Sequence, residues 1–554
     1  MIKNLSFNRK NLASDIGAAV TMAIVAIPDA IASALLAGVN PTYGFNALIV
    51  GTPVGSLFTS SQFMNIGLTA AMMMAVADAL VGIDSSSIVT ALVTLAILIG
   101  VFQLILGLFK LGVFTRFISN AVMIGFLTGV ATVLILGQLG DLTGYQSEYS
   151  NKVMQALDLL LHPLKIDPAT TLIGLGTIAL ILILARTRLR NYSLAVAVLL
   201  SSVAVVLLDL DSVALVGDTN EIVGAIPLPA LPDLSLVRSL LLPAVSIGLL
   251  GLIQAAGISQ TIPNPDGEYP DPSGDFTGQG IANIASGFFR GLPLGGSLGG
   301  TGIIISAGAK SRWANVFMGL LVGGFVLLFA NQVENVAIPA VAAVLIVAGF
   351  GTFRFEAIKD IRDVSRSSMV VMGTTFLATL TMPIQEAIIV GIMLSIFDYV
   401  YTSSKDIQVL ELVLTEDGGF ETRPAPAQLA DNSITILYGL GNFFFAGART
   451  LEDILPHAKE AHRAVVILRL HARSQIRSTF ILVLERYAQK LQATGGKIIL
   501  SGVTEKVKEQ LDRTETTETI PDGDIFMASN KLGTSTKAAI QAAEAWLNDE
   551  GSNK

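Results

Sequence analysis

The sequence predicts a polytopic α-helical membrane protein that ends in a small α/β domain. Hydrophobic residues make up 52% of the 554 residues and charged residues only 14%, and the mean hydropathy is +0.65. Apolar runs of about 20 residues, the length that crosses a bilayer, recur from Ala13 to Thr402. Beyond Thr402 the sequence alternates between strand-like and helix-like patterns, so a polar domain follows the membrane domain.

Composition also excludes several classes of protein. There is no cysteine, so disulfides and thiolate metal sites are ruled out, and a net charge of −8 without a basic stripe argues against nucleic-acid binding. We expect no cofactor and no enzymatic activity, because metal-ligand spacings are lacking and no histidine falls in an apolar run. The four histidines are His162, His457, His462 and His471.

The apolar runs divide into fourteen candidate membrane spans, several of them short. Basic residues cluster in alternate loops, which places the N-terminus and the polar tail in the cytoplasm and the protein in the inner (plasma) membrane. An odd number of spans in each half inverts the second half relative to the first, which predicts a 7+7 inverted repeat. The spans lie near residues 13–38, 43–59, 66–80, 87–108, 117–136, 170–187, 193–208, 240–259, 279–292, 298–308, 313–331, 336–352, 368–382 and 384–402.

Two short, glycine-containing segments occupy corresponding positions in the two halves. Span 3 opens with "MNIGLTAAMMM" and span 10 with "GGSLGGTGIII". A helix that starts in mid-membrane leaves free amides and a positive dipole end, which suits an anion. We therefore predict an anion site where the two starts converge, whereas the alternative interpretation is close helix packing on glycine. The candidate residues are Gly67, Leu68, Thr69, Gly299, Gly300 and Thr301.

The polar tail begins with residues 403–431, which we interpret as an exposed linker with one early strand in "IQVLELVL". From residue 432 to residue 554 the patterns "SITILYGL", "AVVILRL" and "KIILSGV" read as strands, and amphipathic segments between them read as helices. The predicted organisation is thus a transport-type membrane domain over 1–402, a linker, and a compact α/β domain over 432–554.

Several motifs resemble the sulfate permease (SulP/SLC26) family of anion transporters. "AIPDAIASALLAGVNPTYGF" is similar to the family's "IPQAMAYALLAGLPPVYGL", and "GQGIANIASGFFRGLPLGGS" is similar to "GQGLANIASGLFGGIPVSGS". The tail resembles the family's STAS domain. The resemblance implies a mobile core domain (spans 1–4 and 8–11) moving against a gate domain (spans 5–7 and 12–14), an anion between spans 3 and 10, and a homodimer.

This chain departs from the family pattern at the site itself. Gly300 stands where an arginine is usual, and Leu68 replaces a proline. Gln254 in span 8 takes the place of a carboxylate that couples transport to Na⁺ or H⁺. Asp29 in span 1, where relatives have Gln or Glu, is then the candidate for proton coupling, because an intramembrane carboxylate is costly. The alternative for Asp29 is a structural hydrogen bond beside Pro28.

The leading hypothesis is a secondary transporter of small inorganic or carboxylate anions (sulfate, bicarbonate or a dicarboxylate), with elevator-type alternating access and H⁺ coupling through Asp29. One alternative is a transport-inactive regulatory protein that acts through its STAS domain and a cytoplasmic protein partner. Another is a nucleobase permease, but the STAS-like tail argues against it, because related 14-span carriers lack such a tail. Ser478 is interpreted as a helix N-cap, with a phosphorylation site as the alternative.

Overall fold

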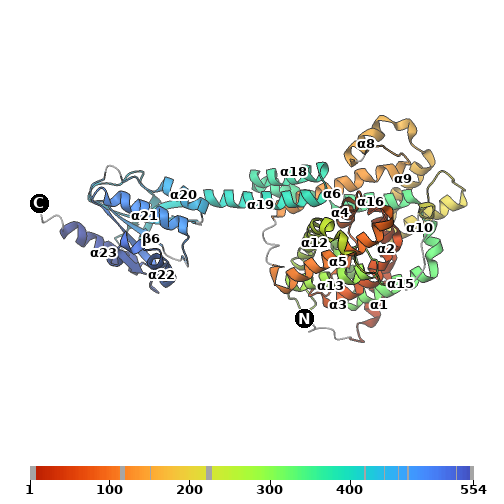
Figure 1. Cartoon of the computed structure of the whole chain (residues 1–554), viewed down its shortest axis with the longest axis horizontal. Helices are drawn as coiled ribbons and strands as arrows, with labels where there is room; N and C mark the ends of the chain where they lie inside the picture. Colours follow the sequence, from red (N-terminus) through yellow and green to blue (C-terminus); the bar gives the residue numbers. More distant parts are fainter. Residues whose placement is uncertain are drawn as a thin grey trace. The chain divides into compact units, whose positions relative to one another are not determined.

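The computed structural model describes residues 8–112, 119–149, 151–219, 227–416, 419–441, 443, 445–458, 461–470, 473, 475–531 and 533–549. The chain separates into two compact units, Met1–Ser395 and Ile396–Lys554 (Figure 1). The first unit is built almost wholly of helices and the second of a sheet with helices on both faces.

Most helices of the first unit coincide with the predicted spans. They are α1 (Leu12–Leu36), α2 (Pro41–Asn46), α3 (Thr52–Phe58), α4 (Ala70–Leu80), α5 (Ile88–Leu108), α6 (Asn120–Gly137), α7 (Leu139–Thr143), α8 (Lys152–Leu161), α9 (Pro168–Leu184), α10 (Ser193–Leu207), α11 (Val216–Thr219), α12 (Val237–Ser259), α13 (Pro272–Phe288), α14 (Leu298–Ser306), α15 (Trp313–Glu334), α16 (Ile338–Thr352), α17 (Phe355–Val364), α18 (Arg366–Thr381) and α19 (Ile384–Lys405), which continues into the second unit.

Three predicted spans are not single helices. The second is broken by a π-helical turn, Ala47–Gly51, which joins α2 to α3 just before Pro53. The third and tenth each begin as a three-residue strand, β1 (Asn65–Gly67) and β2 (Gly295–Ser297), before α4 and α14 start. Proline at the first helical turn and an Asn or Asp cap define the starts of α2, α9 and α13.

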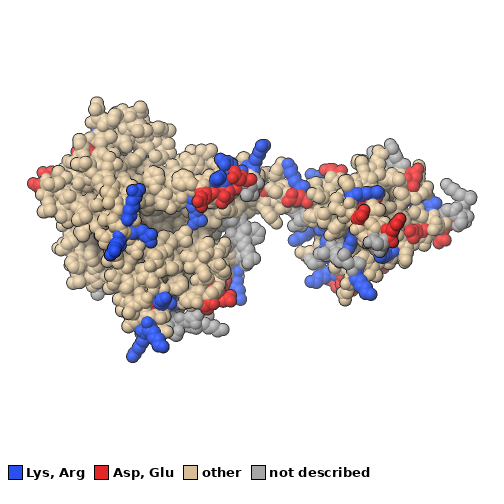
Figure 2. All heavy atoms as spheres, turned by 180° about the vertical axis from the view of Figure 1, so that it is seen from behind, with Lys and Arg blue, Asp and Glu red and all other residues tan. Residues whose placement is uncertain are grey.

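Length and hydropathy alone qualify seven helical stretches of the described chain for crossing a membrane. These stretches start at Leu12, Ser85, Asn120, Arg190, Leu234, Trp313 and Ile338. Their outward faces carry large apolar side chains, with Leu199, Leu207, Leu320 and Leu328 each more than 60% exposed. Lipid tails are the environment in which such side chains are stable. Figure 2 is consistent with a lipid environment, because few charged side chains lie on the face of this unit that it shows.

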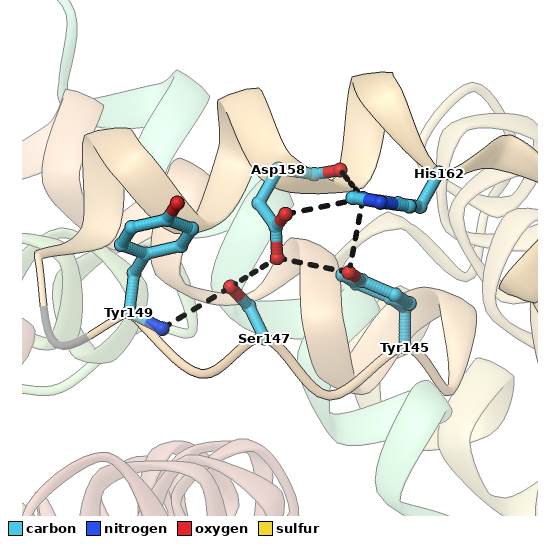
Figure 3. A network of polar contacts seen from close by, with 5 residues as sticks. All are labelled: Tyr145, Ser147, Tyr149, Asp158 and His162. Carbon is cyan, nitrogen blue, oxygen red and sulfur yellow. Dashed lines mark hydrogen bonds and ion pairs between the residues drawn. The ribbon is translucent and has the colours of Figure 1, made fainter.

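An amphipathic helix, α8, lies between α7 and α9 and was not predicted. Asn151 caps it, and the loop before it is fixed to it by one carboxylate (Figure 3). Asp158 Oδ2 accepts hydrogen bonds from Ser147 Oγ (2.6 Å) and Tyr145 Oη (2.8 Å), and His162 Nδ1 lies 3.1 Å from Oδ1. The bonds from Ser147 and Tyr145 hold the pKa of Asp158 below its ordinary value.

The second unit is a six-stranded sheet in the order β4-β3-β5-β6-β7-β8. Strands β5 to β8 are parallel, and β3 runs antiparallel to both of its neighbours. Helices α20, α21 and α22 pack on one face and α23 on the other (Figure 1). The elements are β3 (Gln408–Leu414), β4 (Phe420–Pro424), β5 (Ile434–Leu440), α20 (Phe445–Ile454), β6 (Val465–Arg469), α21 (Ser478–Gln492), β7 (Lys497–Val503), α22 (Glu505–Arg513), β8 (Ile525–Met527) and α23 (Thr534–Asp549).

The interpretation of residues 403–431 as an exposed linker needs correction. The early strand is present as β3, and a second strand, β4, follows it within the same segment. Both belong to the sheet, and Glu411 of β3 forms a two-pronged ion pair with Arg423 of β4. The hydrophobic face of β3 is needed to cover β5, so the folded unit includes this segment.

Candidate functional site

The two short strands pair with each other in the middle of the first unit. In this antiparallel pair Asn65 faces Ser297, Ile66 faces Gly296 and Gly67 faces Gly295. Helix α4 starts three residues after Gly67, and α14 starts directly after Ser297. Because the strands run in opposite directions, the two helices leave the pair in opposite directions. The sequence prediction that the starts of spans 3 and 10 meet is therefore confirmed.

Glycine is required at this crossing mainly by the closeness of neighbouring groups. A Cβ on Gly295 would lie 2.5 Å from Met72 Sδ, and one on Gly296 would lie 2.9 Å from the Ala255 Cα. A Cβ on Gly300 would lie 2.6 Å from Asn65 Oδ1. At Gly299 and Gly302, in contrast, a Cβ would meet nothing within 4 Å. The packing interpretation thus holds for three of the five glycines and fails for two.

Two predicted anion ligands of α14 are already used by the protein. The Gly300 amide donates to Ser297 Oγ (3.0 Å), which caps the helix. Thr301 is fully buried, and its hydroxyl donates to the Ser297 carbonyl (2.6 Å) and accepts from the Asn65 amide (3.0 Å). These groups hold the strand pair together. On α14, Gly299 is the predicted residue that is exposed.

The start of α4 differs from that of α14. Thr69 occupies the N-cap position without capping, and its hydroxyl donates instead to Gln254 Oε1 of α12 (3.2 Å). The first amides of α4 therefore have no side-chain cap, and the first turn of a helix offers them no carbonyl. Leu68 is buried beside them, whereas Thr69 and Gln254 are half-buried. The structure thus brings Gly67, Thr69 and Gln254 together at one helix start.

Asp29 lies in α1 directly after Pro28, half-buried, and α1 packs against both α4 and α14. Its carboxylate has no hydrogen bond or ion pair with any residue that the structure describes. A structural hydrogen-bonding role, the alternative considered from the sequence, therefore has no partner in the described chain. Arg290 lies beyond the end of α13 with φ +57°, it is exposed, and its carbonyl accepts from Asn46 (3.4 Å).

Buried side-chain amides that the site prediction missed support the crossing. Asn283 of α13 donates to the Leu294 carbonyl (2.8 Å) and accepts from the Leu294 amide (2.6 Å), which fixes the approach to β2. Asn283 also donates to Gln103 of α5 (2.8 Å). On the other strand, Asn65 donates to Asn315 (2.8 Å). The available signal was an amide side chain inside an apolar run, where an unpaired polar group is costly.

The ends of the site helices near Asp15 and Arg312 are also fixed by polar contacts. Asp15 accepts from the amides of Lys310 (2.7 Å) and Ser311 (3.0 Å), in the turn after α14. Arg312 Nη1 donates to three carbonyls at the end of α3, those of Ser56, Leu57 and Thr59. The strand pair is thus held between helices that are themselves tied together.

Comparison with known proteins identifies two families in the chain. Residues 12–375 match the model of the sulfate permease family, and residues 427–531 match that of the STAS domain. The putative sulfate transporter YvdB of Bacillus subtilis is 24% identical over 92% of this chain and 94% of its own length. The bicarbonate transporter BicA of Synechocystis is 24% identical over 72% of each chain.

The fold is also shared with solved structures. The murine Slc26a9 anion transporter in its inward-facing state superposes with a TM-score of 0.84 at 16% identity, over 98% of this chain and 92% of that one. The transmembrane domain of a cyanobacterial BicA gives a TM-score of 0.58 at 24% identity, over 70% of this chain and 98% of that domain. This multi-pass membrane protein belongs to the sulfate permease family, a family of transporters rather than enzymes, and carries a C-terminal STAS domain.

Proposed function

We propose that this protein is a secondary transporter that binds a small oxyanion at the start of α4, opposite Gly299 of α14. The observation that carries the proposal is the strand pair, which brings an uncapped helix start beside Gln254 and Thr69. Free amides and the positive end of a helix dipole attract an anion in a low-dielectric setting. No lysine or arginine belongs to the strand pair or to α4, so amides carry the recognition.

Substrate candidates are sulfate, bicarbonate and dicarboxylates such as fumarate. Relatives named as sulfate and bicarbonate transporters support the first two. Each of these anions presents several oxygens to the amides of Ala71 and Met72 and to the exposed Gly299, beside the Gln254 side chain that the Thr69 hydroxyl orients. Gln254 already accepts from Thr69 and has its amide protons left for the ligand.

Asp29 is proposed to take up a proton when the anion binds. Its carboxylate lies within an apolar helix without a partner in the described chain, and a carboxylate in that setting is favoured in its neutral form. We further propose that a core domain moves against a gate domain during transport. The N-terminus and the STAS domain lie in the cytoplasm, and two copies form a homodimer. The resemblance to the family and the basic loops support that arrangement.

The test is uptake of labelled sulfate, bicarbonate and fumarate into proteoliposomes, with and without an inward proton gradient. Wild type is compared with Asp29→Asn and with Asp84→Asn, a control carboxylate that is exposed in the loop before α5. We expect gradient-stimulated uptake of at least one anion that is lost in Asp29→Asn and kept in Asp84→Asn. Gradient-stimulated uptake that survives Asp29→Asn would refute the coupling role.

The binding half of the proposal is tested separately with Thr69→Val. This substitution removes the hydroxyl next to the open amides but keeps the branched shape, and Thr90→Val is the control because Thr90 bonds only its own helix turn. We expect Thr69→Val to raise the KM for the anion several-fold and Thr90→Val to leave it unchanged. Absence of uptake of any anion by folded wild-type protein would favour a regulatory protein that acts through its STAS domain.

A further inference from the structure

Helix α8 presents an apolar face that the described part of the chain leaves uncovered. Four apolar side chains of the helix and one just beyond its end are exposed, namely Met154, Leu157, Leu160, Leu161 and Leu164. Leu160 and Leu161 are 75% and 77% exposed, and Leu164 is 98% exposed. Spacings of three and four residues place these side chains along one side of the helix. A contiguous apolar surface of this kind marks a contact with something other than water.

The polar side chains of α8 are used on the side toward the preceding loop. Asp158 accepts hydrogen bonds there from Tyr145 and Ser147 (Figure 3). Gln155 donates to the Tyr149 carbonyl (2.6 Å). The exposed leucines and methionine therefore form an apolar face, and the polar contacts of the helix lie elsewhere. Such a division is typical of a helix that lies in the plane of a membrane surface.

Packing against α6 sets the depth of α8. The chain turns at Gly144 (φ +72°) after α7, and α8 then packs back against α6 and α7. The stem of Lys152 lies against Gly137, the last residue of α6, since a Cβ on this glycine would be 3.3 Å from Lys152 Cδ. The stretch Asn120–Thr143 is long and apolar enough to cross a membrane. Helix α8 thus starts at the level where a spanning stretch ends, which is the boundary between lipid tails and headgroups.

The apolar surface of α8 continues along the chain into α9. A 3₁₀ turn, Pro163–Lys165, follows α8 directly, and α9 begins at Pro168. Leu172 of α9 is 73% exposed, and Leu175, one turn further, is exposed as well. Helix α7 packs against both α8 and α9, and Figure 1 shows α8 at the outer edge of the first unit. The face of α8 therefore extends the surface that the membrane helices offer to lipid.

We propose that α8 is an in-plane anchor, whose apolar face inserts among phospholipids at the membrane surface where α6 ends and α9 begins. The acyl chains take the exposed leucines and methionine. Lys165, exposed in the turn after α8, reaches the headgroup phosphates, as a long cationic side chain does at a membrane surface. Tyr149, exposed in the loop before α8, lies at the same boundary, where tyrosine is enriched. The anchor is independent of which anion the protein carries.

The test places one spin label at a time on the full-length protein in liposomes of phosphatidylcholine and phosphatidylglycerol. Because the chain has no cysteine, each introduced cysteine carries the only label. Electron paramagnetic resonance then compares collisions of the label with oxygen, which concentrates in lipid, and with a water-soluble nickel chelate. The test positions are Leu157→Cys and Leu161→Cys. Leu175→Cys on α9 is the lipid control, and Glu148→Cys, exposed in the loop before α8, is the water control.

We expect the ratio of oxygen to nickel collisions at Leu157→Cys and Leu161→Cys to be several-fold higher than at Glu148→Cys and close to that at Leu175→Cys. A ratio equal to that at Glu148→Cys would place α8 in water and overturn the proposal. Low collision rates with both reagents would show that protein covers the face, and would overturn it too.

A second measurement separates lipid from another copy of the chain. Labelled Leu161→Cys protein is mixed with an excess of unlabelled wild type before reconstitution. If lipid covers the face, the spectrum should not change on this dilution, because no second label lies nearby. A spectrum that sharpens on dilution would show that the α8 faces of two copies meet, and the proposal of a lipid anchor would be wrong.

Discussion

Substitution of alanine for each glycine at the start of α14 separates the tightly packed glycine from the free ones. Alanine favours a helix over glycine by about 1 kcal/mol, and at Gly299 and Gly302 its Cβ meets nothing within 4 Å. At Gly300 the Cβ would lie 2.6 Å from Asn65 Oδ1 and 3.0 Å from Ser297 Oγ. The same chemical change should therefore stabilise at two positions and destabilise at the third.

The size of the loss at Gly300 follows from what must move. Overpacking a tight contact costs about 1–3 kcal/mol. If Asn65 turns away instead, its 2.8 Å bond to Asn315 breaks and leaves a buried carbonyl unsatisfied, at a cost of about 1–3 kcal/mol. Either cost exceeds or cancels the gain in helix propensity. Gly300→Ala should thus be less stable than Gly299→Ala by about 1–3 kcal/mol, after the shared propensity term cancels.

The assay is the apparent Tm of detergent-purified protein, followed by the loss of monodisperse material on heating. A polytopic protein does not unfold as a two-state system, so the order of the Tm values is the result that counts. We expect Gly300→Ala below wild type and Gly299→Ala and Gly302→Ala at or above it. In the Asn65→Ala background, Gly300→Ala should cost nothing further. Equal Tm values for Gly299→Ala and Gly300→Ala would refute the role given to Asn65.

Three further predictions concern other contacts. Asn283→Ala removes both bonds to the Leu294 backbone and should lower the apparent Tm by several degrees, a loss that Asn283→Asp, which keeps only the acceptor, should share in part. Thr301→Val leaves the Asn65 amide unsatisfied and should reduce stability by about 1–3 kcal/mol. The KM for the anion should not change, which would confirm that the Thr301 hydroxyl does not bind the anion. Because the pKa of Asp158 is lowered in the fold, its ionised carboxylate stabilises the contact with α8 at pH values above the ordinary carboxyl range, and this stability is lost as the pH falls through the lowered pKa. Ser147→Ala removes the main cause of the lowered pKa, so the apparent Tm should begin to fall at a higher pH than in wild type. An unchanged dependence of Tm on acidic pH would contradict this.

The sequence was sufficient to predict where the long apolar helices of the first unit lie, because an apolar run of about 20 residues is a clear signal. It also located the crossing of spans 3 and 10, since glycines concentrated in one short stretch disrupt a helix. The short amphipathic helix α8 was not predicted. It did not reveal that β1 and β2 pair, because three residues have no recognisable strand pattern. Nor could the sequence distinguish Gly299, which has open space around it, from Gly300, which packs against Asn65 of a segment distant in sequence.

The prediction that Gly300 and Thr301 bind the anion failed for the same kind of physical reason. A hydroxyl or an amide at a helix start is equally suited to an anion and to the protein's own backbone, and the sequence alone does not say which one takes it. Here Ser297 Oγ accepts from the Gly300 amide and the Ser297 carbonyl accepts from the Thr301 hydroxyl, so α14 is closed to an anion at both residues. With α14 closed, the uncapped start of α4 has to supply most of the binding. That asymmetry predicts a larger effect on KM for Thr69→Val than for any hydroxyl removed from α14, and equal effects would contradict it.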